Sequence, residues 1–208
     1  MSAAPPPPEG GRHRRLIIEA AIGLTARSGW SAVTMARLAE LVGVSRQTVY
    51  NELGSKTVLA DAMVSHELER FLSAVGAAFD RHPDDLVEAV YDAVRAVLEL
   101  ADDNLLLRAI ASATHGADME LLPMLTTRAA QLLVQAKTML TERVVGYGPD
   151  LTADQIAAAI DLLVRTVLSH VMQPSDTPAA TADGLAWVAA RVLGTPARPR
   201  LRHAATGG

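Results

Sequence analysis

Residues 42–56, VGVSRQTVYNELGSK, place several hydrogen-bonding side chains almost next to one another, directly after a Gly-Val step. These side chains are Ser45, Arg46, Gln47, Thr48, Tyr50 and Asn51. A carboxamide can form paired hydrogen bonds with adenine, and a guanidinium can do so with O6 and N7 of guanine. The hydroxyls, together with the ammonium of Lys56, suit phosphate oxygens. The stretch therefore indicates a surface that reads nucleic-acid bases, since an ordinary solvated surface is richer in Glu and Lys.

A short helix must position these side chains. Ser45 can cap it at the start, and it should reach about Leu53 and stop at Gly54. With about 100° of rotation per residue, Val49 marks the centre of the buried face, so Gln47 and Asn51 point outward one turn apart. The alternative is a plain solvated polar face, which the flanking glycine turns disfavour.

Two further helices should support this one. The first covers 13–28 and ends at Gly29, with an apolar stripe of Ile17, Ala20, Ala21 and Leu24. The second follows a capping Thr34 and ends at Gly43, with an apolar stripe of Met35, Leu38, Ala39 and Val42. A fourth helix starts after Ser55 and runs toward Arg81. Short helices separated by glycine turns predict a helix-turn-helix module.

The segment from Thr34 to Leu59 resembles the DNA-binding domain of the TetR family of bacterial repressors. The shared pattern is a capping Thr, an apolar stripe, Gly-Val-Ser, Thr-x-Tyr and Ser-Lys followed by Leu, and the resemblance covers roughly residues 12–60. It implies a homodimer that inserts one reading helix from each protomer into a near-palindromic operator of double-stranded DNA. It also implies that Arg46 and Gln47 lie nearest the base edges, and that phosphates are held by Thr34, Thr48, Tyr50 and Lys56.

The complete set of expected DNA-contacting residues is Arg14, Arg15, Thr34, Arg37, Ser45, Arg46, Gln47, Thr48, Tyr50, Asn51 and Lys56. The cluster of Arg12, Arg14 and Arg15 can reach phosphate or the minor groove, or can be a solvated basic tail. Glu52 departs from the family pattern, and we expect it to turn away from DNA or to pair with Arg46 or Lys56.

Charge and composition agree with a basic module followed by an acidic one. Residues 1–56 carry seven Lys and Arg against four acidic residues, and residues 57–208 carry 12 against 19. The chain of 208 residues is 50% hydrophobic and 3% aromatic, which favours packed helices over sheets. We therefore predict an all-α fold with a disordered Pro-rich segment at 1–11, a helix-turn-helix domain at 12–56, an effector-binding and dimerisation domain at 57–194 and a disordered tail at 195–208.

Several classes of protein are disfavoured. No Cys is present, and no two of the six His are spaced to share a helical face, so neither a metal nor another cofactor is expected. No recognised catalytic motif occurs, and we expect no enzyme. The apolar stretch 156–172 is interrupted by Asp161, Arg165 and His170, and the N-terminus lacks the features of a signal peptide. A soluble, cytoplasmic protein without a membrane partner is expected.

The last two helices of the larger domain, which begin after capping residues Thr152 and Thr177, are too apolar for a solvated surface. A four-helix bundle between two protomers would bury them, and a core within one protomer is the alternative. The expected dimer interface is Ile156, Ile160, Leu163, Val164, Val167, Leu168, Val171, Leu185, Val188 and Val192. Earlier helices are expected from Pro83, over 104–113 and over 123–145.

The helices between 56 and 145 should surround a cavity for a hydrophobic small-molecule effector, such as a fatty acyl chain. Its expected lining is Phe71, Val75, Phe79, Tyr91, Val94, Arg95, Leu98, Leu106, Ile110, His115, Met119, Leu132 and Met139, with Tyr91, Arg95 or His115 as the polar contact. The predicted function is a ligand-responsive transcriptional repressor. Alternatives are an activator or a ligand-independent regulator and, more remotely, an all-helical carrier or enzyme.

Overall fold

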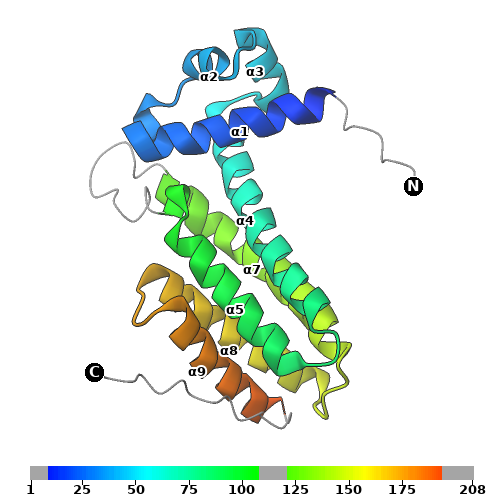
Figure 1. Cartoon of the computed structure of the whole chain (residues 1–208). Helices are drawn as coiled ribbons and strands as arrows, with labels where there is room; N and C mark the ends of the chain where they lie inside the picture. Colours follow the sequence, from blue (N-terminus) through cyan, green and yellow to red (C-terminus); the bar gives the residue numbers. More distant parts are fainter. Residues whose placement is uncertain (1–8, 108–120, 194–208) are drawn as a thin grey trace, which may run out of the picture. The chain divides into compact units, whose positions relative to one another are not determined.

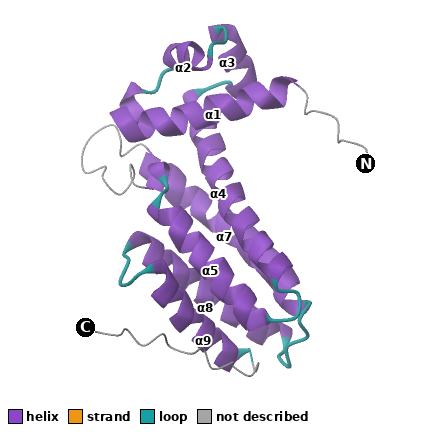
Figure 2. Ribbon diagram, viewed as in Figure 1, coloured by secondary structure: helices purple, strands orange, loops and turns teal. Residues whose placement is uncertain are grey.

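The computed structural model describes the backbone of residues 9–107 and 121–193 and the side chains of residues 11–107 and 133–193. Within these ranges every regular element is a helix and no strand occurs, which confirms the all-α prediction (Figure 2). The elements are α1 (Glu9–Ser28), η1 (Trp30–Ala32), α2 (Met35–Val42), α3 (Arg46–Leu53), α4 (Lys56–Arg81), α5 (Leu86–Asp102), α7 (Leu121–Val145), α8 (Ala153–Met172) and α9 (Pro178–Val192). Figure 1 labels the α-helices.

The chain forms two compact units, one of residues 1–73 with 99–135 and the other of residues 74–98 with 136–208. This division differs from the boundary expected between residues 56 and 57. The physical reason is that α4 begins there and packs its first turns into the helix-turn-helix core through Leu59 and Met63, which are both fully buried.

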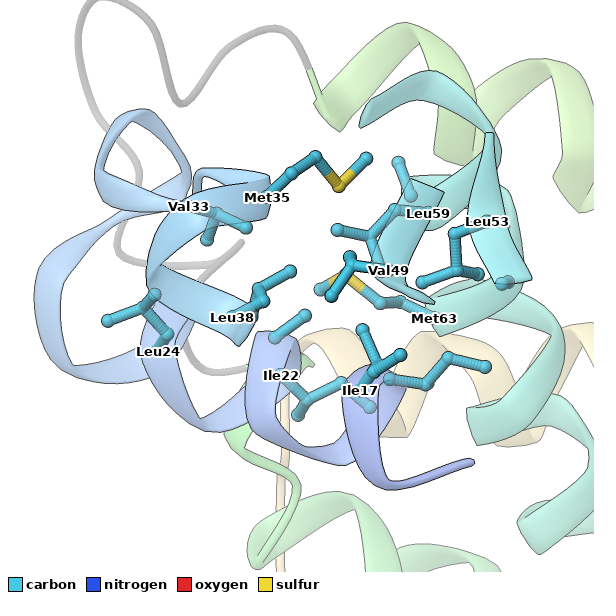
Figure 3. Close-up of a cluster of buried hydrophobic side chains, with 14 of the residues drawn as sticks. Ile17, Ile22, Leu24, Val33, Met35, Leu38, Val49, Leu53, Leu59 and Met63 are labelled. Atoms are coloured by element: carbon cyan, nitrogen blue, oxygen red, sulfur yellow. The ribbon is translucent and has the colours of Figure 1, made fainter. Parts of the chain in front are cut away.

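Apolar side chains from the first four α-helices converge on the core of the first unit (Figure 3). They include Ile17 and Ile22 of α1, Leu38 of α2, Val49 and Leu53 of α3, and Leu59 and Met63 of α4. Leu106, which lies far along the chain in the short helical segment 105–107, is buried in the same cluster. This core holds α3 by one face only and leaves the opposite face to solvent.

The core of the second unit is built from the later helices. Its buried members include Phe79 of α4, Val90 and Val94 of α5, and Ile156 and Ile160 of α8. Helix α9 contributes small residues, Ala182, Ala186 and Ala189, that allow close approach of its backbone. Helices α8 and α9 follow one another through a short loop and pack together (Figure 1).

Capping residues account for most of the helix boundaries. Thr152 and Gln155 form the expected capping box, and the Thr177 hydroxyl accepts from the Ala180 amide. The start of α5 differs from the prediction, because Pro83 lies in a turn and the Asp85 carboxylate caps the helix through the Glu88 amide at 3.1 Å. Helix α1 begins at Glu9 rather than His13, and α7 at Leu121 rather than residue 123.

Helix α8 is long and apolar enough, by length and composition, to cross a membrane, although the interruptions in its sequence suggested otherwise. One such helix is weak evidence for a membrane span. Asp161, in the middle of α8, accepts hydrogen bonds from Lys137 of α7 and from Arg165 one turn along. Both bonds hold the Asp161 pKa below its ordinary value.

Candidate nucleic-acid interface

The turn between α2 and α3 sets the direction of the reading helix. Gly43 adopts φ 74° and ψ 33°, a left-handed conformation in which a β-carbon is disfavoured, and its amide donates to the Ala39 carbonyl at 2.9 Å. Thr34 caps α2 through the Arg37 amide at 3.2 Å, and Ser45 caps α3 through the Thr48 amide at 3.0 Å. The chain therefore ends α2 at Gly43 and begins α3 at Ser45, and a hydrogen bond is made at each of these two boundaries.

Helix α3 presents its two carboxamides to solvent, as its helical period predicts. Val49 and Leu53 are buried at 0% and 1% exposure, whereas Gln47 and Asn51 are exposed. The Gln47 Nε2 donates to Asn51 Oδ1 at 2.9 Å, so the two amides form one unit. This unit leaves the Gln47 oxygen as an acceptor and the Asn51 nitrogen as a donor, which is the pair that the edge of an adenine requires.

The residues that flank these amides are held by neighbours on the same helix. The Arg46 guanidinium lies over the Tyr50 ring, 6.0 Å from its centroid, and Tyr50 is exposed. The Thr48 hydroxyl lies 2.8 Å from the Ser45 hydroxyl. Arg46 is thus exposed beside the carboxamides, where a guanine edge or a phosphate could meet it.

Two of the predicted phosphate contacts have partners inside the protein. The Arg14 guanidinium donates to the Glu52 carbonyl at the end of α3. The Lys56 ammonium donates to the Trp30 carbonyl at 2.9 Å and lies 4.6 Å from the centroid of the Trp30 ring. Arg15 pairs with Glu19 at 2.8 Å on the exposed side of α1, and Arg37 is exposed on α2.

Glu52 was expected to turn away from DNA or to pair with Arg46 or Lys56. All three residues lie in the described part of the chain, and no salt bridge joins them there. Lys56 contacts Trp30 instead, and Arg46 lies over Tyr50. The pairing alternative is therefore not seen.

The expected effector residues divide between the two cores. Val75, Phe79, Val94 and Leu98 are buried in the second unit, with Tyr91 and Met139 partly buried against them. Leu106 belongs instead to the core of the first unit, and Phe71, in the same unit, is half-buried. Arg95, in the second unit, is exposed. Ile110, His115, Met119 and the side chain of Leu132 lie outside the described residues.

A buried polar group in the first unit was missed from the sequence. Glu67 is 7% exposed and accepts a hydrogen bond from the side-chain amide of Asn104, which is 3% exposed and follows the end of α5 in the chain. Arg70 also donates to Glu67, at 2.9 Å, and Asn104 caps the segment 105–107 through the Leu107 amide. In the sequence, the only sign of this buried group is that Glu67 lies on the inner face of α4. The sequence does not indicate its partner, because Asn104 is 37 residues away in the chain.

A second polar cluster closes the turn between α4 and α5. The His82 imidazole lies 2.7 Å from the Asp92 carboxylate, and Arg81 pairs with the same carboxylate at 3.3 Å. Burial alone would raise the Asp92 pKa, but the hydrogen bonds and charges of His82 and Arg81 lower it below its ordinary value. Tyr147 donates to the His82 carbonyl at 2.6 Å, and burial raises the Tyr147 pKa.

Helices α8 and α9 expose several large apolar side chains. Leu162 and Met172 of α8 are 60% and 66% exposed, and Trp187 of α9 is 57% exposed beneath the Arg191 guanidinium. Of the expected interface residues, Leu168, Val188 and Val192 are exposed. Ile156 and Ile160 are buried in the protomer's own core and have little surface to offer, while Leu163, Val164, Val167, Val171 and Leu185 pack partly against that core.

Two family models match the chain. The one described as bacterial regulatory proteins of the tetR family matches residues 17–63. The one described as the C-terminal domain of the bacterial tetracyclin repressor matches residues 85–191, just over half of the chain.

Individual proteins show the same similarity along most of the chain. The HTH-type transcriptional regulator AlkX of Mycobacterium tuberculosis is 29% identical over 174 residues, which cover 83% of this chain and 81% of that protein. The crystal structure of the TetR family repressor AlkX from Dietzia sp., implicated in biodegradation of n-alkanes, has a TM-score of 0.69 at 28% identity and covers 86% of this chain and 96% of that one. A putative tetR-family regulator from Mesorhizobium loti shares the fold at 17% identity, with a TM-score of 0.68 over 89% of this chain and 98% of that one.

Proposed function

Because the chain belongs to the TetR family of bacterial DNA-binding transcription regulators, we propose that it is a cytoplasmic repressor that binds a near-palindromic operator as a homodimer. A largely apolar small molecule releases it from the DNA. The observation that carries the proposal is the outward face of α3, where Gln47 and Asn51 are exposed and hydrogen-bonded to one another while Val49 and Leu53 are buried. This arrangement suits insertion of α3 into a major groove.

The exposed face of α8 and α9 supports the homodimer. Leu162, Met172 and Trp187 are each more than half exposed, and large apolar side chains with this exposure are candidates for burial against a partner. A second copy would bury this face in a four-helix bundle. In such a dimer the two reading helices must stand about 34–36 Å apart to reach successive major grooves.

An apolar effector is supported by the second core and by one relative. The residues expected to line the effector site that are buried there, Val75, Phe79, Val94 and Leu98, are all apolar. The repressor from Dietzia is implicated in n-alkane biodegradation. Binding of such a molecule would act by favouring a conformation in which the two reading helices no longer match the groove spacing.

Footprinting on duplex DNA that flanks the protein's own gene tests the proposal. We expect two protected half-sites about one duplex turn apart, and loss of protection when a long n-alkane or a long-chain fatty acid is added. Citrate, a small polyanion, is the control and should have no effect. Absence of any protected site, or release by citrate alone, would reject the proposal.

A further inference from the structure

Two basic side chains of the helix-turn-helix module contact backbone carbonyls that are distant in the sequence. Arg14 of α1 donates to the carbonyl of Glu52, 38 residues away, and Lys56 donates to that of Trp30, 26 residues away. Both hydrogen bonds are partly buried. We propose that Arg14 and Lys56 are positioning residues that clamp the α2–α3 pair, and that neither supplies a phosphate contact. This inference rests on the proposed DNA binding.

Helix α3 needs such a clamp because its own anchorage is narrow. It has eight residues, about 12 Å of length, and its buried side chains are Val49 and Leu53. These two lie one turn apart on a single line along the helix, so they resist lifting of the helix more strongly than rolling about that line. Rolling would swing Gln47 and Asn51 away from the base edges.

Arg14 acts at the C-terminal end of α3. The carbonyls of the last helical turn lack partners within the helix, and the end of a helix carries a partial negative charge. The guanidinium satisfies the Glu52 carbonyl and places a positive charge at this end. Because Arg14 is itself part of α1, the bond fixes the end of α3 to a longer helix that is anchored by Ile17 and Ala21, both fully buried.

Lys56 acts at the other boundary of the pair. It is the first residue of α4, and its partner Trp30 lies in η1, shortly before the cap of α2. The segment that contains α2 and α3 is therefore enclosed between the two bonded residues. Trp30 is 2% exposed, and its ring also contacts the Lys56 ammonium at 4.6 Å. A cation held on both the carbonyl and the ring is less available to a phosphate.

The two roles have different signatures in salt titrations. A side chain that neutralises a phosphate contributes to binding of any sequence, and its removal reduces the slope of log affinity against log salt by about 0.9. A positioning residue contributes to DNA affinity only through the base contacts that it aligns. Its removal therefore lowers the affinity for the selected sequence and leaves the slope of log affinity against log salt unchanged. Arg37, exposed on α2, is the matched basic control.

The experiment uses the full chain with the variants Arg14→Met, Lys56→Met and Arg37→Met. A duplex selected by the wild-type protein from a randomised library is compared with a scrambled duplex over a series of KCl concentrations. We expect each clamp variant to lose about tenfold in affinity for the selected duplex, the size of a hydrogen bond to a charged group, with unchanged binding of the scrambled one. Arg37→Met should weaken both duplexes and reduce the slope by about 0.9.

The inference is overturned if the clamp variants lose affinity equally for both duplexes and show a reduced salt slope. It is also overturned if they lose no affinity at all. Circular dichroism establishes that the variants are folded. A second measurement needs neither clamp residue changed, because in Trp187→Phe the indole of Trp30 is the only one left. Since Trp187 lies on the proposed dimer surface, gel filtration and the affinity for the selected duplex are first compared with those of the wild type. Its emission maximum should stay constant when the selected duplex is added, and a shift would show that Lys56 leaves the ring. If the wild-type protein selects no duplex, the proposed function fails instead.

Discussion

At the scale of single residues, side chains of similar chemistry have different surroundings. Gln47 and Asn51 are exposed, and the hydrogen bond between them leaves the Gln47 side-chain oxygen and the Asn51 side-chain nitrogen for DNA. Lys56 has its ammonium on Trp30. Glu67 is a buried carboxylate that accepts hydrogen bonds from Asn104 and Arg70. Residue type alone would assign the first three to DNA and leave Glu67 on the surface.

Gln47→Ala should relax the base preference of the operator. Its loss removes one reading group and frees Asn51 from its partner, so discrimination against a wrong base should fall by about 1–3 kcal/mol. The measurement is the Kd for duplexes with single base-pair changes in each half-site.

Asn51→Ala and the double variant complete a double-mutant cycle. Because the two amides are bonded to one another, we expect their effects on DNA affinity to be less than additive. Strict additivity, or an unchanged base preference in Gln47→Ala, would contradict the assignment of this pair as the reading unit.

At the scale of elements, the turn between α2 and α3 depends on a glycine in the left-handed conformation. Gly43 has φ 74°, and no atom lies within 4 Å of the place that a β-carbon would occupy. Gly43→Ala should therefore reduce the free energy of unfolding by about 1 kcal/mol through backbone strain, without a clash. Urea unfolding measures this loss.

Gly11→Ala is the matched control, since Gly11 lies in α1 and its added β-carbon would also meet no atom within 4 Å. Helical alanine is preferred over glycine, so this variant should be neutral or more stable by up to about 1 kcal/mol. Equal losses in the two variants would mean that the Gly43 conformation is not the cause.

At the scale of the whole molecule, the proposed function requires a second copy that covers the apolar side chains exposed on α8 and α9. Leu162→Asp places a charge where the proposed dimer buries a leucine that is 60% exposed in the single chain. We expect monomers in light scattering coupled to gel filtration, and loss of operator binding because one reading helix alone makes half of the contacts.

Val145→Asp provides the control, since Val145 is 53% exposed at the end of α7 and outside the proposed interface. It should remain dimeric. A dimeric Leu162→Asp protein would show that α8 is covered by something other than a second copy.

Local rules were enough to predict much of this protein from the sequence. Capping residues, glycine turns and apolar stripes repeat over three or four residues, so they predicted α2, α3, α4 and the outward direction of Gln47 and Asn51. The same rules predicted the capping box of α8. These features depend on neighbours within about one helical turn.

Contacts between distant segments were decided only by the tertiary structure. Arg14 with Glu52, Lys56 with Trp30 and Asn104 with Glu67 join residues 26 to 38 positions apart, and no periodic pattern encodes such pairs. Packing also divided the apolar positions of α8, since Ile156 and Ile160 fill the protomer's core while Leu162 and Met172 are exposed. A hydrophobic stripe predicts that a side chain is buried, but which surface buries it depends on the neighbouring helices.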